Sequence, residues 1–292
     1  MRVVVFGATG FIGRALLPAL AAEQEVVAVS RSPRPPQKGM TWVVADVTDA
    51  PAVRRALDGA DVVYYLVHSL GSADFEERDV SGARTTAAEA ETAGARQIVY
   101  LGGLGEEGEE LSPHLRSRLE TGRALASGAV PLTTLRAAVV VGKGSAAFET
   151  IVALVDRLPV MVAPRWVSTP TQPIALADTV RYLAAVAGRE ETIGETYDLG
   201  GPEIMTYRQM IERVAKMRCK RRAIIEVPIL TPFLSSLWLH LVTPVGASVA
   251  RPLVEGLRNP TVAEDTRILD LVPFPLTPFD RAAREALDVG DW

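Results

Sequence analysis

The sequence of 292 residues contains few of the side chains that make disulfides or metal sites. It has one cysteine, Cys219, and three histidines. A single cysteine cannot form an intramolecular disulfide, and neither a cysteine-based nor a histidine-rich metal site is expected, so we predict no metal centre. Positive charge is not in excess, because 31 Lys and Arg residues stand against 35 Asp and Glu residues, for a net charge of −4. This balance argues against a broad basic surface that holds nucleic acid.

We expect neither a targeting segment nor a run that crosses a membrane. An apolar strand starts the chain without the pattern of a signal peptide, and we therefore expect a cytoplasmic protein. Residues 227–250 contain no Asp, Glu, Lys or Arg, but three prolines and one glycine interrupt them, which disfavours a spanning helix. We interpret this segment as an apolar cover of an active-site cleft, and contact with a membrane surface is left open.

The most informative stretch is at the start, where an apolar strand over residues 3–6, a glycine turn and an apolar helix follow one another. The turn has glycines at a spacing of three, namely Gly7, Gly10 and Gly13. In a dinucleotide-binding turn, the first glycine permits the tight bend and the second lets a pyrophosphate approach the helix N-terminus. The third lets the helix pack close to the strand. We predict that the cofactor contacts in this turn also include Thr9, Phe11, Ile12 and Arg14. The alternative is a turn with a structural role only.

The end of the second predicted strand, residues 25–29, indicates which cofactor is preferred. NAD-binding proteins usually place an Asp or Glu there to bind the ribose 2′-hydroxyl. This sequence has Ser30 and Arg31 instead, with Arg34 and Arg14 nearby. Cations suit a 2′-phosphate through charge-assisted hydrogen bonds, so the pattern favours NADP over NAD. The alternative is that these arginines are solvated loop residues.

Strands and helices continue to alternate along the chain. Apolar runs predict six strands, at residues 3–6, 25–29, 40–45, 62–66, 97–101 and 132–141, with helices between them. This alternation predicts an α/β fold: a Rossmann-type doubly wound parallel sheet with a small C-terminal lobe on the substrate side. We expect residues 1–144 to form the NAD(P)-binding core. Residues 145–292 are expected to complete the sheet in part and to form the substrate lobe and an apolar lid.

Ligands in such folds bind at the carboxyl ends of the strands, which predicts further contacts with the cofactor. Asp46 and Val47 follow the third strand and are expected beside the adenine. The fourth strand leads into Leu66, Val67 and His68, which are expected near the nicotinamide ribose. Gly102 follows the fifth strand and completes the predicted set.

These motifs resemble the atypical or extended short-chain dehydrogenase/reductase superfamily, particularly the NmrA-like proteins and the Rossmann accessory subunit of respiratory complex I. The likeness covers about residues 1–225 and is specific for fold and cofactor. It is carried by residues 7–13, 46–47, 64–71, 101–104, 136, 197–202 and 206–210.

The sequence departs from this superfamily at the usual catalytic groups. The resemblance implies a serine after the fifth strand and a tyrosine four residues before a lysine on the next helix, where the tyrosine exchanges a proton. Here the serine position holds glycine (102 or 103), the tyrosine position holds His114, and the lysine position holds Arg118. His114 or His68 is a candidate proton donor, and Arg118 could hold a ribose or a carbonyl oxygen. Lys143, in a glycine loop, is the fourth candidate. Each also has a purely structural interpretation.

Three functions are therefore weighed. The first is an NADP(H)-dependent oxidoreductase that acts on an apolar small molecule without the usual Ser/Tyr/Lys set. The second is a non-catalytic NAD(P)-binding redox sensor or accessory protein. The third is a non-redox isomerase, dehydratase or cyclase, because the fold alone does not specify the reaction. The substrate pocket is expected to be apolar, walled by residues 145–175 and 227–258. Both a monomer and a homodimer are compatible with the sequence.

Overall fold

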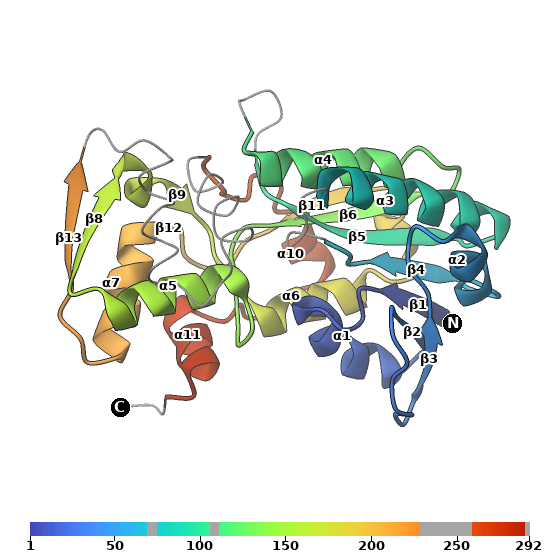
Figure 1. Ribbon diagram of the computed structural model, residues 1–292, viewed down its shortest axis with the longest axis horizontal. Coiled ribbons are helices and arrows are strands. Elements are labelled where there is room, and N and C mark those ends of the chain that lie inside the picture. Colours follow the sequence, from blue (N-terminus) through green and yellow to red (C-terminus); the bar gives the residue numbers. More distant parts are fainter. Residues whose placement is uncertain (69–74, 106–110, 228–258, 290–292) are drawn as a thin grey trace.

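The computed structural model describes residues 1–68, 75–105, 111–227 and 259–289, and its centre is a seven-stranded sheet (Figure 1). The strand order is β11-β6-β5-β4-β1-β2-β3, and all six neighbouring pairs are parallel. The strands are β1 (Arg2–Phe6), β2 (Glu25–Ser30), β3 (Met40–Val44), β4 (Val62–Tyr65), β5 (Gln97–Gly103), β6 (Leu132–Ala137) and β11 (Thr196–Leu199). The predicted doubly wound parallel sheet is thereby confirmed.

Helices cover both faces of this sheet. One face carries α1 (Phe11–Ala21) and α6 (Leu176–Ala185), below the sheet in Figure 1. The other face carries α2 (Ala50–Ala56), α3 (Phe75–Thr92) and α4 (Pro113–Leu125). Because successive side chains of a strand point to opposite faces, each central strand contributes to two separate buried clusters. In β1, for example, Val3 and Val5 pack with α1, whereas Val4 and Phe6 pack toward α2 and α3.

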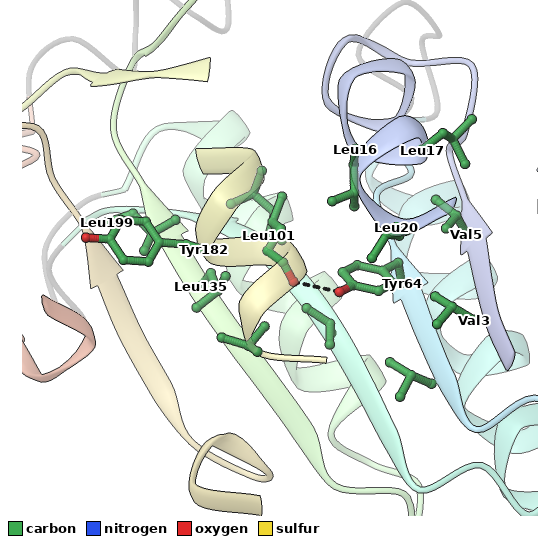
Figure 2. Packing of buried hydrophobic residues seen from close by; sticks show 14 of the residues in the cluster. Val3, Val5, Leu16, Leu17, Leu20, Tyr64, Leu101, Leu135, Tyr182 and Leu199 are labelled. Carbon is green, nitrogen blue, oxygen red and sulfur yellow. Dashed lines mark hydrogen bonds between the residues drawn. The ribbon is translucent and has the colours of Figure 1, made fainter. Parts of the chain in front are cut away.

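The neighbouring tyrosines of β4 show this alternation most clearly. Tyr64 and Tyr65 are both fully buried, one in each cluster. The Tyr64 hydroxyl donates a hydrogen bond of 2.6 Å to the carbonyl oxygen of Leu183 in α6 (Figure 2). The Tyr65 hydroxyl lies 3.4 Å from the carbonyl oxygen of Asp79 in α3. The central strand is therefore tied to a helix on each side.

The predicted sixth strand over residues 132–141 is wrong as a single element. It divides into β6 and the short β7 (Val140–Val141), which leaves the main sheet and pairs with β10 (Ile174–Ala175). The division follows the hydrogen bonding, because the Ala137 carbonyl accepts from Leu104 in the main sheet while the Val139 carbonyl already accepts from Ile174. The edge strand beside β6 is instead β11, from later in the chain.

A third buried cluster lies at the other end of the molecule, on the left in Figure 1. Its main helices are α5 (Ala146–Arg157), α7 (Tyr207–Met217) and α11 (Phe279–Leu287). They pack with two small sheets: β8 (Val160–Pro164) with β13 (Ala223–Val227), which are parallel, and β9 (Pro170–Thr171) with β12 (Met205–Thr206), which are antiparallel. Short helical segments complete the described chain: η1 (Arg165–Ser168), η2 (Glu190–Thr192) and α10 (Arg267–Leu271).

Two features that the sequence made improbable, a membrane-spanning helix and a metal centre, concern the described residues. No described helix has the length and apolar character needed to cross a membrane. The described residues contain no cluster of His, Cys, Asp and Glu suited to a metal ion. The predicted apolar cover, except for Val227 at the end of β13, lies outside the described residues.

We predict that Tyr64→Phe lowers the free energy of unfolding by about 1–2 kcal/mol, because it removes a short buried hydrogen bond. Tyr65→Phe is the matched control, and its loss is expected to be smaller because its hydrogen bond is long. Urea denaturation of the three proteins measures both effects. Equal losses in the two variants would contradict the importance given to the bond between β4 and α6.

Candidate dinucleotide-binding site

The turn between β1 and α1 has no space for side chains at two of its three glycines. Gly7 has a φ of +80°, and a Cβ atom there would lie 2.5 Å from the carbonyl oxygen of Leu66. A Cβ atom on Gly13 would lie 2.3 Å from the carbonyl oxygen of Gly7. Both distances are far below van der Waals contact. These two glycines are therefore required for the close packing of β1, α1 and the segment after β4.

Gly10 differs from the other two because a Cβ atom there would meet a single neighbouring atom and would not come closer to it than 3 Å. A Cβ atom there would approach one atom within 4 Å, the Gly7 carbonyl oxygen at 3.1 Å. Gly10 is the N-cap of α1, no side chain of the described residues caps the helix, and its first turn holds no Asp or Glu. The first N–H groups of a helix lack internal partners and carry partial positive charge. This end of α1 is thus suited to an anionic group such as a pyrophosphate.

A cavity of about 510 Å³ opens at this point, at the carboxyl ends of β1, β2, β3 and β4. It brings together ten residues predicted from sequence to bind a cofactor. They are Gly7, Thr9, Gly10, Ser30, Arg31, Asp46, Val47, Leu66, Val67 and His68. Thr48 and Arg78 also line the cavity, although neither was singled out in the sequence.

The other predicted cofactor residues lie outside this lining. Gly13 serves the helix packing just described, and Ile12 packs against the buried cluster under α1. The Phe11 ring faces the loop after β7, since a Cβ atom on Gly142 would lie 3.2 Å from it. Arg14 is exposed on α1. Gly102 lines a second cavity, of about 340 Å³, between α4, β5, β6 and β11.

The far side of the first cavity is polar, and its one carboxylate among the described lining residues is Asp46. Asp46 Oδ1 accepts hydrogen bonds from the Thr48 amide at 3.0 Å and the Thr48 hydroxyl at 2.7 Å. Arg78 reaches from α3 to within 3.6 Å of Asp46 Oδ2. The Thr48 amide, together with the charges of Arg78 and Arg31, lowers the pKa of Asp46. The cavity therefore holds one carboxylate whose ionised form is favoured, together with two arginines.

His68 stands at the opposite side of the cavity, after β4, and is held by a buried carboxylate. Its Nδ1 atom lies 2.7 Å from Oδ2 of Asp79 in α3, and the Asp79 side chain is 1% exposed. Burial lowers the pKa of His68, and the hydrogen bond to Asp79 opposes part of that shift. A histidine held in this way by a carboxylate is a candidate for proton exchange with a bound molecule.

Asp79 was not recognised from the sequence, although a signal was present. It occupies the position that continues the buried stripe of α3 through Ala83, Ala87 and Ala90. An acidic residue on the apolar side of a helix requires a buried hydrogen-bonding partner. Arg78 offers no comparable signal, because it lies in a charged run that reads as a solvated helix face.

The four catalytic candidates are not gathered at one point. The Arg118 guanidinium lies over the Tyr100 ring, 4.9 Å from its centre, and lines the second cavity with Gly102. The positive charge of Arg118 also lowers the pKa of His68 by electrostatic repulsion. Lys143 Nζ instead pairs with Asp288 Oδ2 at 2.6 Å, and both side chains are more than two-thirds exposed. His114 lies in the first turn of α4, and its side chain is outside the described part of the chain.

A parallel doubly wound sheet with a glycine turn and a polar cavity at its carboxyl edge is the arrangement in which dinucleotide-binding proteins hold their ligand. Residues 7–136 match the NAD(P)H-binding family. This match bears out the predicted resemblance for the N-terminal part of the chain, and the solved structures described below bear it out for the fold.

Three similar proteins illustrate this relationship. A mitochondrial protein of Arabidopsis thaliana, NADH dehydrogenase (ubiquinone) 1 alpha subcomplex subunit 9, is 26% identical over 223 residues. That match covers 71% of this chain but 56% of the plant protein, so the chain spans about half of its relative.

Two solved structures share the fold over nearly the whole of both chains. The NADPH-dependent quinone oxidoreductase of Escherichia coli, complexed with NADPH, has a TM-score of 0.78 at 21% identity, covering 99% of each chain. A nucleoside-diphosphate-sugar epimerase of Staphylococcus aureus has a TM-score of 0.78 at 16% identity, covering 98% of this chain and 100% of that one.

We predict that Gly10→Ala and Gly13→Ala separate binding from folding. The methyl group of Gly10→Ala projects into the space at the start of α1, so the affinity for the cofactor should fall at least about tenfold while the free energy of unfolding changes by less than about 1 kcal/mol. Gly13→Ala should instead destabilise the chain by about 1–3 kcal/mol or more, through overpacking. Nucleotide titration and urea denaturation measure the two quantities. Unaltered affinity in a folded Gly10→Ala variant would contradict the proposed position of the pyrophosphate.

The lowered pKa of His68 predicts a dependence of stability on pH. Below the unfolded pKa of ~6.5, the unfolded chain binds a proton at this residue more readily than the folded chain does. The contribution is therefore fully present above pH ~6.5 and is lost as the pH falls through the folded pKa. We expect the difference in unfolding free energy between wild type and His68→Gln to shrink below pH ~6.5, measured by urea denaturation at a series of pH values. A difference that stays constant with pH would show that burial does not suppress protonation of His68.

Proposed function

We propose that the protein is an NADP(H)-dependent oxidoreductase that acts on an apolar small molecule. The observation that carries the proposal is the composition of the first cavity where β2 ends. Ser30 and Arg31 line it there, at the place where an NAD-binding protein usually presents a carboxylate to the ribose 2′-hydroxyl. Arg31 would instead bind a 2′-phosphate through charge-assisted hydrogen bonds.

The remaining charges of the cavity support NADP over NAD. Its one described carboxylate, Asp46, is already occupied by Thr48 and paired with Arg78. It therefore does not cancel the charge of Arg31 by a direct ion pair. The E. coli quinone oxidoreductase, which shares the fold, is described as NADPH-dependent and was solved with NADPH. That similarity agrees with the proposal but does not carry it.

The chemistry proposed for the site needs few protein groups. The bound nicotinamide supplies the hydride, and the protein must orient the substrate and deliver a proton. His68, held by Asp79 through Nδ1, is the proposed proton donor in its protonated form, in which both ring nitrogens carry a proton. The usual tyrosine and lysine are replaced by His114 and Arg118. Reduction of a polarised C=C or C=N bond depends less on such a pair than carbonyl reduction does, and it is the proposed reaction type.

A second candidate function is a non-catalytic NAD(P)-binding sensor or accessory protein. The observation that favours it is the placement of Arg118, whose guanidinium lies on the Tyr100 ring and lines the second cavity rather than the first. An arginine also stays protonated, so it does not exchange a proton as the family's tyrosine does. The similar Arabidopsis protein is a named subunit of an NADH dehydrogenase. A non-redox isomerase, dehydratase or cyclase is the third candidate, and a product of unchanged oxidation state would identify it.

Titration with NADPH and NADH tests the cofactor proposal. We expect wild type to bind NADPH at least about tenfold more tightly than NADH, in keeping with one charge-assisted contact of about 1.5–3 kcal/mol. Arg31→Ala should lose this preference while its affinity for NADH changes little. Arg34→Ala is the matched control, because Arg34 is exposed and does not line the cavity. Nicotinamide fluorescence measures both affinities.

The same proteins then separate the candidate functions. Oxidation of NADPH by an apolar acceptor such as a quinone, reduced strongly in His68→Gln, would support the oxidoreductase. Tight NADPH binding with no turnover across a panel of acceptors would favour the sensor or accessory protein. Equal affinity for NADPH and NADH in wild type and in Arg31→Ala would overturn the preference for NADP.

A further inference from the structure

The outer face of the two-stranded sheet β8/β13 exposes a strip of β-branched apolar side chains. Val160 is 49% exposed, Val162 is 39% exposed, and Ile225 is 51% exposed. Ile225 is the register partner of Val162, so these two lie side by side across the strands. The alternate residues of β8, Met161 and Ala163, are buried in the third cluster. The sheet is therefore apolar on both faces, and its outer face is not covered by the described residues.

An uncovered apolar face is unusual for two parallel strands. Parallel strands occur mostly in sheets with both faces covered, and their sequences are correspondingly apolar on both sides. Exposed single apolar residues are common, but a contiguous strip on one sheet face indicates a contact surface. The strip by itself does not say what it contacts.

A run of cations at one end of the strip supplies the second observation. Residues 216–222 hold five of them: Lys216, Arg218, Lys220, Arg221 and Arg222. One described carboxylate, Asp156, pairs with two of the five, at 2.9 Å from Arg218 and 2.6 Å from Lys220. The run is therefore net positive, although the chain as a whole carries a net charge of −4.

The cationic run and the apolar strip are continuous. Arg221 and Arg222 directly precede β13, and the Ala223 amide donates a hydrogen bond of 3.1 Å to the Pro159 carbonyl, just before β8 begins. Both strands thus start beside the cations. Figure 1 shows this small sheet at the end of the molecule away from β1, β2 and β3, which line the first cavity. Contact at this face would leave the cavity accessible.

We propose that the strip of Val160, Val162 and Ile225, with the cationic run 216–222, binds the surface of an anionic lipid membrane. Lysine and arginine near a negatively charged bilayer contribute attraction, and apolar side chains beside them enter the interface between headgroups and acyl chains. The charge asymmetry of the chain orients this end toward the lipid and the acidic remainder away from it. Nucleic acid would use the cations but not the aliphatic strip, and is therefore the less favoured occupant. The proposal does not depend on the cofactor or the reaction.

Sedimentation of the full chain with lipid vesicles tests the proposal. We expect binding to vesicles of phosphatidylcholine mixed with phosphatidylglycerol, weaker binding to phosphatidylcholine alone, and a decrease between about 0.15 M and about 0.5 M salt. The double variant Lys216→Glu/Arg221→Glu should bind the mixed vesicles at least about tenfold more weakly. Val162→Ser/Ile225→Ser should weaken binding at both salt concentrations, because it removes the apolar contribution.

Matched controls are available on other surfaces. Arg55→Glu reverses an exposed cation on α2, and Ile204→Ser removes an isoleucine that is 61% exposed outside this sheet. Both should bind vesicles as wild type does, and thermal unfolding checks that all variants are folded. Absence of vesicle binding by wild type would overturn the proposal. Salt-sensitive binding to duplex DNA without binding to vesicles would overturn it in favour of nucleic acid, and equal losses in the control variants would overturn the assignment to this face.

Discussion

The closeness of α1 to β1 is the constraint on which the rest of the cofactor site depends. The helix approaches the strand so nearly that a single methyl group on Gly13 would overlap the backbone of Gly7. This packing directs the uncapped start of α1 toward the carboxyl ends of the neighbouring strands. The strand order then places β4 on one side of β1 and β2 on the other, so the two halves of a dinucleotide bound here would lie on opposite sides of one helix terminus.

The central strand β4 connects this site to the hydrophobic core. Its two tyrosines bond to helices on opposite faces of the sheet, and His68 follows three residues later. Asp79 takes part twice, since its carbonyl oxygen faces Tyr65 while its carboxylate holds His68. The position of the histidine at the cavity is therefore coupled to the packing of α3 on the sheet. A rigid core supports the ring that we propose as proton donor, as expected for a functional group that must be preorganised.

The electrostatics of the cavity follow from few groups. A helix terminus and two arginines supply positive potential where phosphates would lie, and the charged Asp46 is hydrogen-bonded by Thr48 and paired with Arg78. Arg118 stacks on Tyr100 next to a second cavity, which Gly102 and Gly103 also line. The polar groups of the first cavity and the guanidinium of Arg118 therefore lie at two separate cavities.

The sequence by itself determined the strand–turn–helix opening, the alternation of strands and helices, and ten residues of the cavity. These follow from short-range rules, because glycine spacing, apolar periodicity and the ends of strands are set by neighbours a few positions apart. Only the tertiary structure decided which distant residues join them. The packing of α3 brings Arg78 to the cavity and Asp79 to His68. Lys143 forms an ion pair with Asp288. The run 132–141 is divided by hydrogen bonds to residues 104 and 174. Such pairings depend on packing between segments that are far apart in the chain, and local sequence carries little information about them.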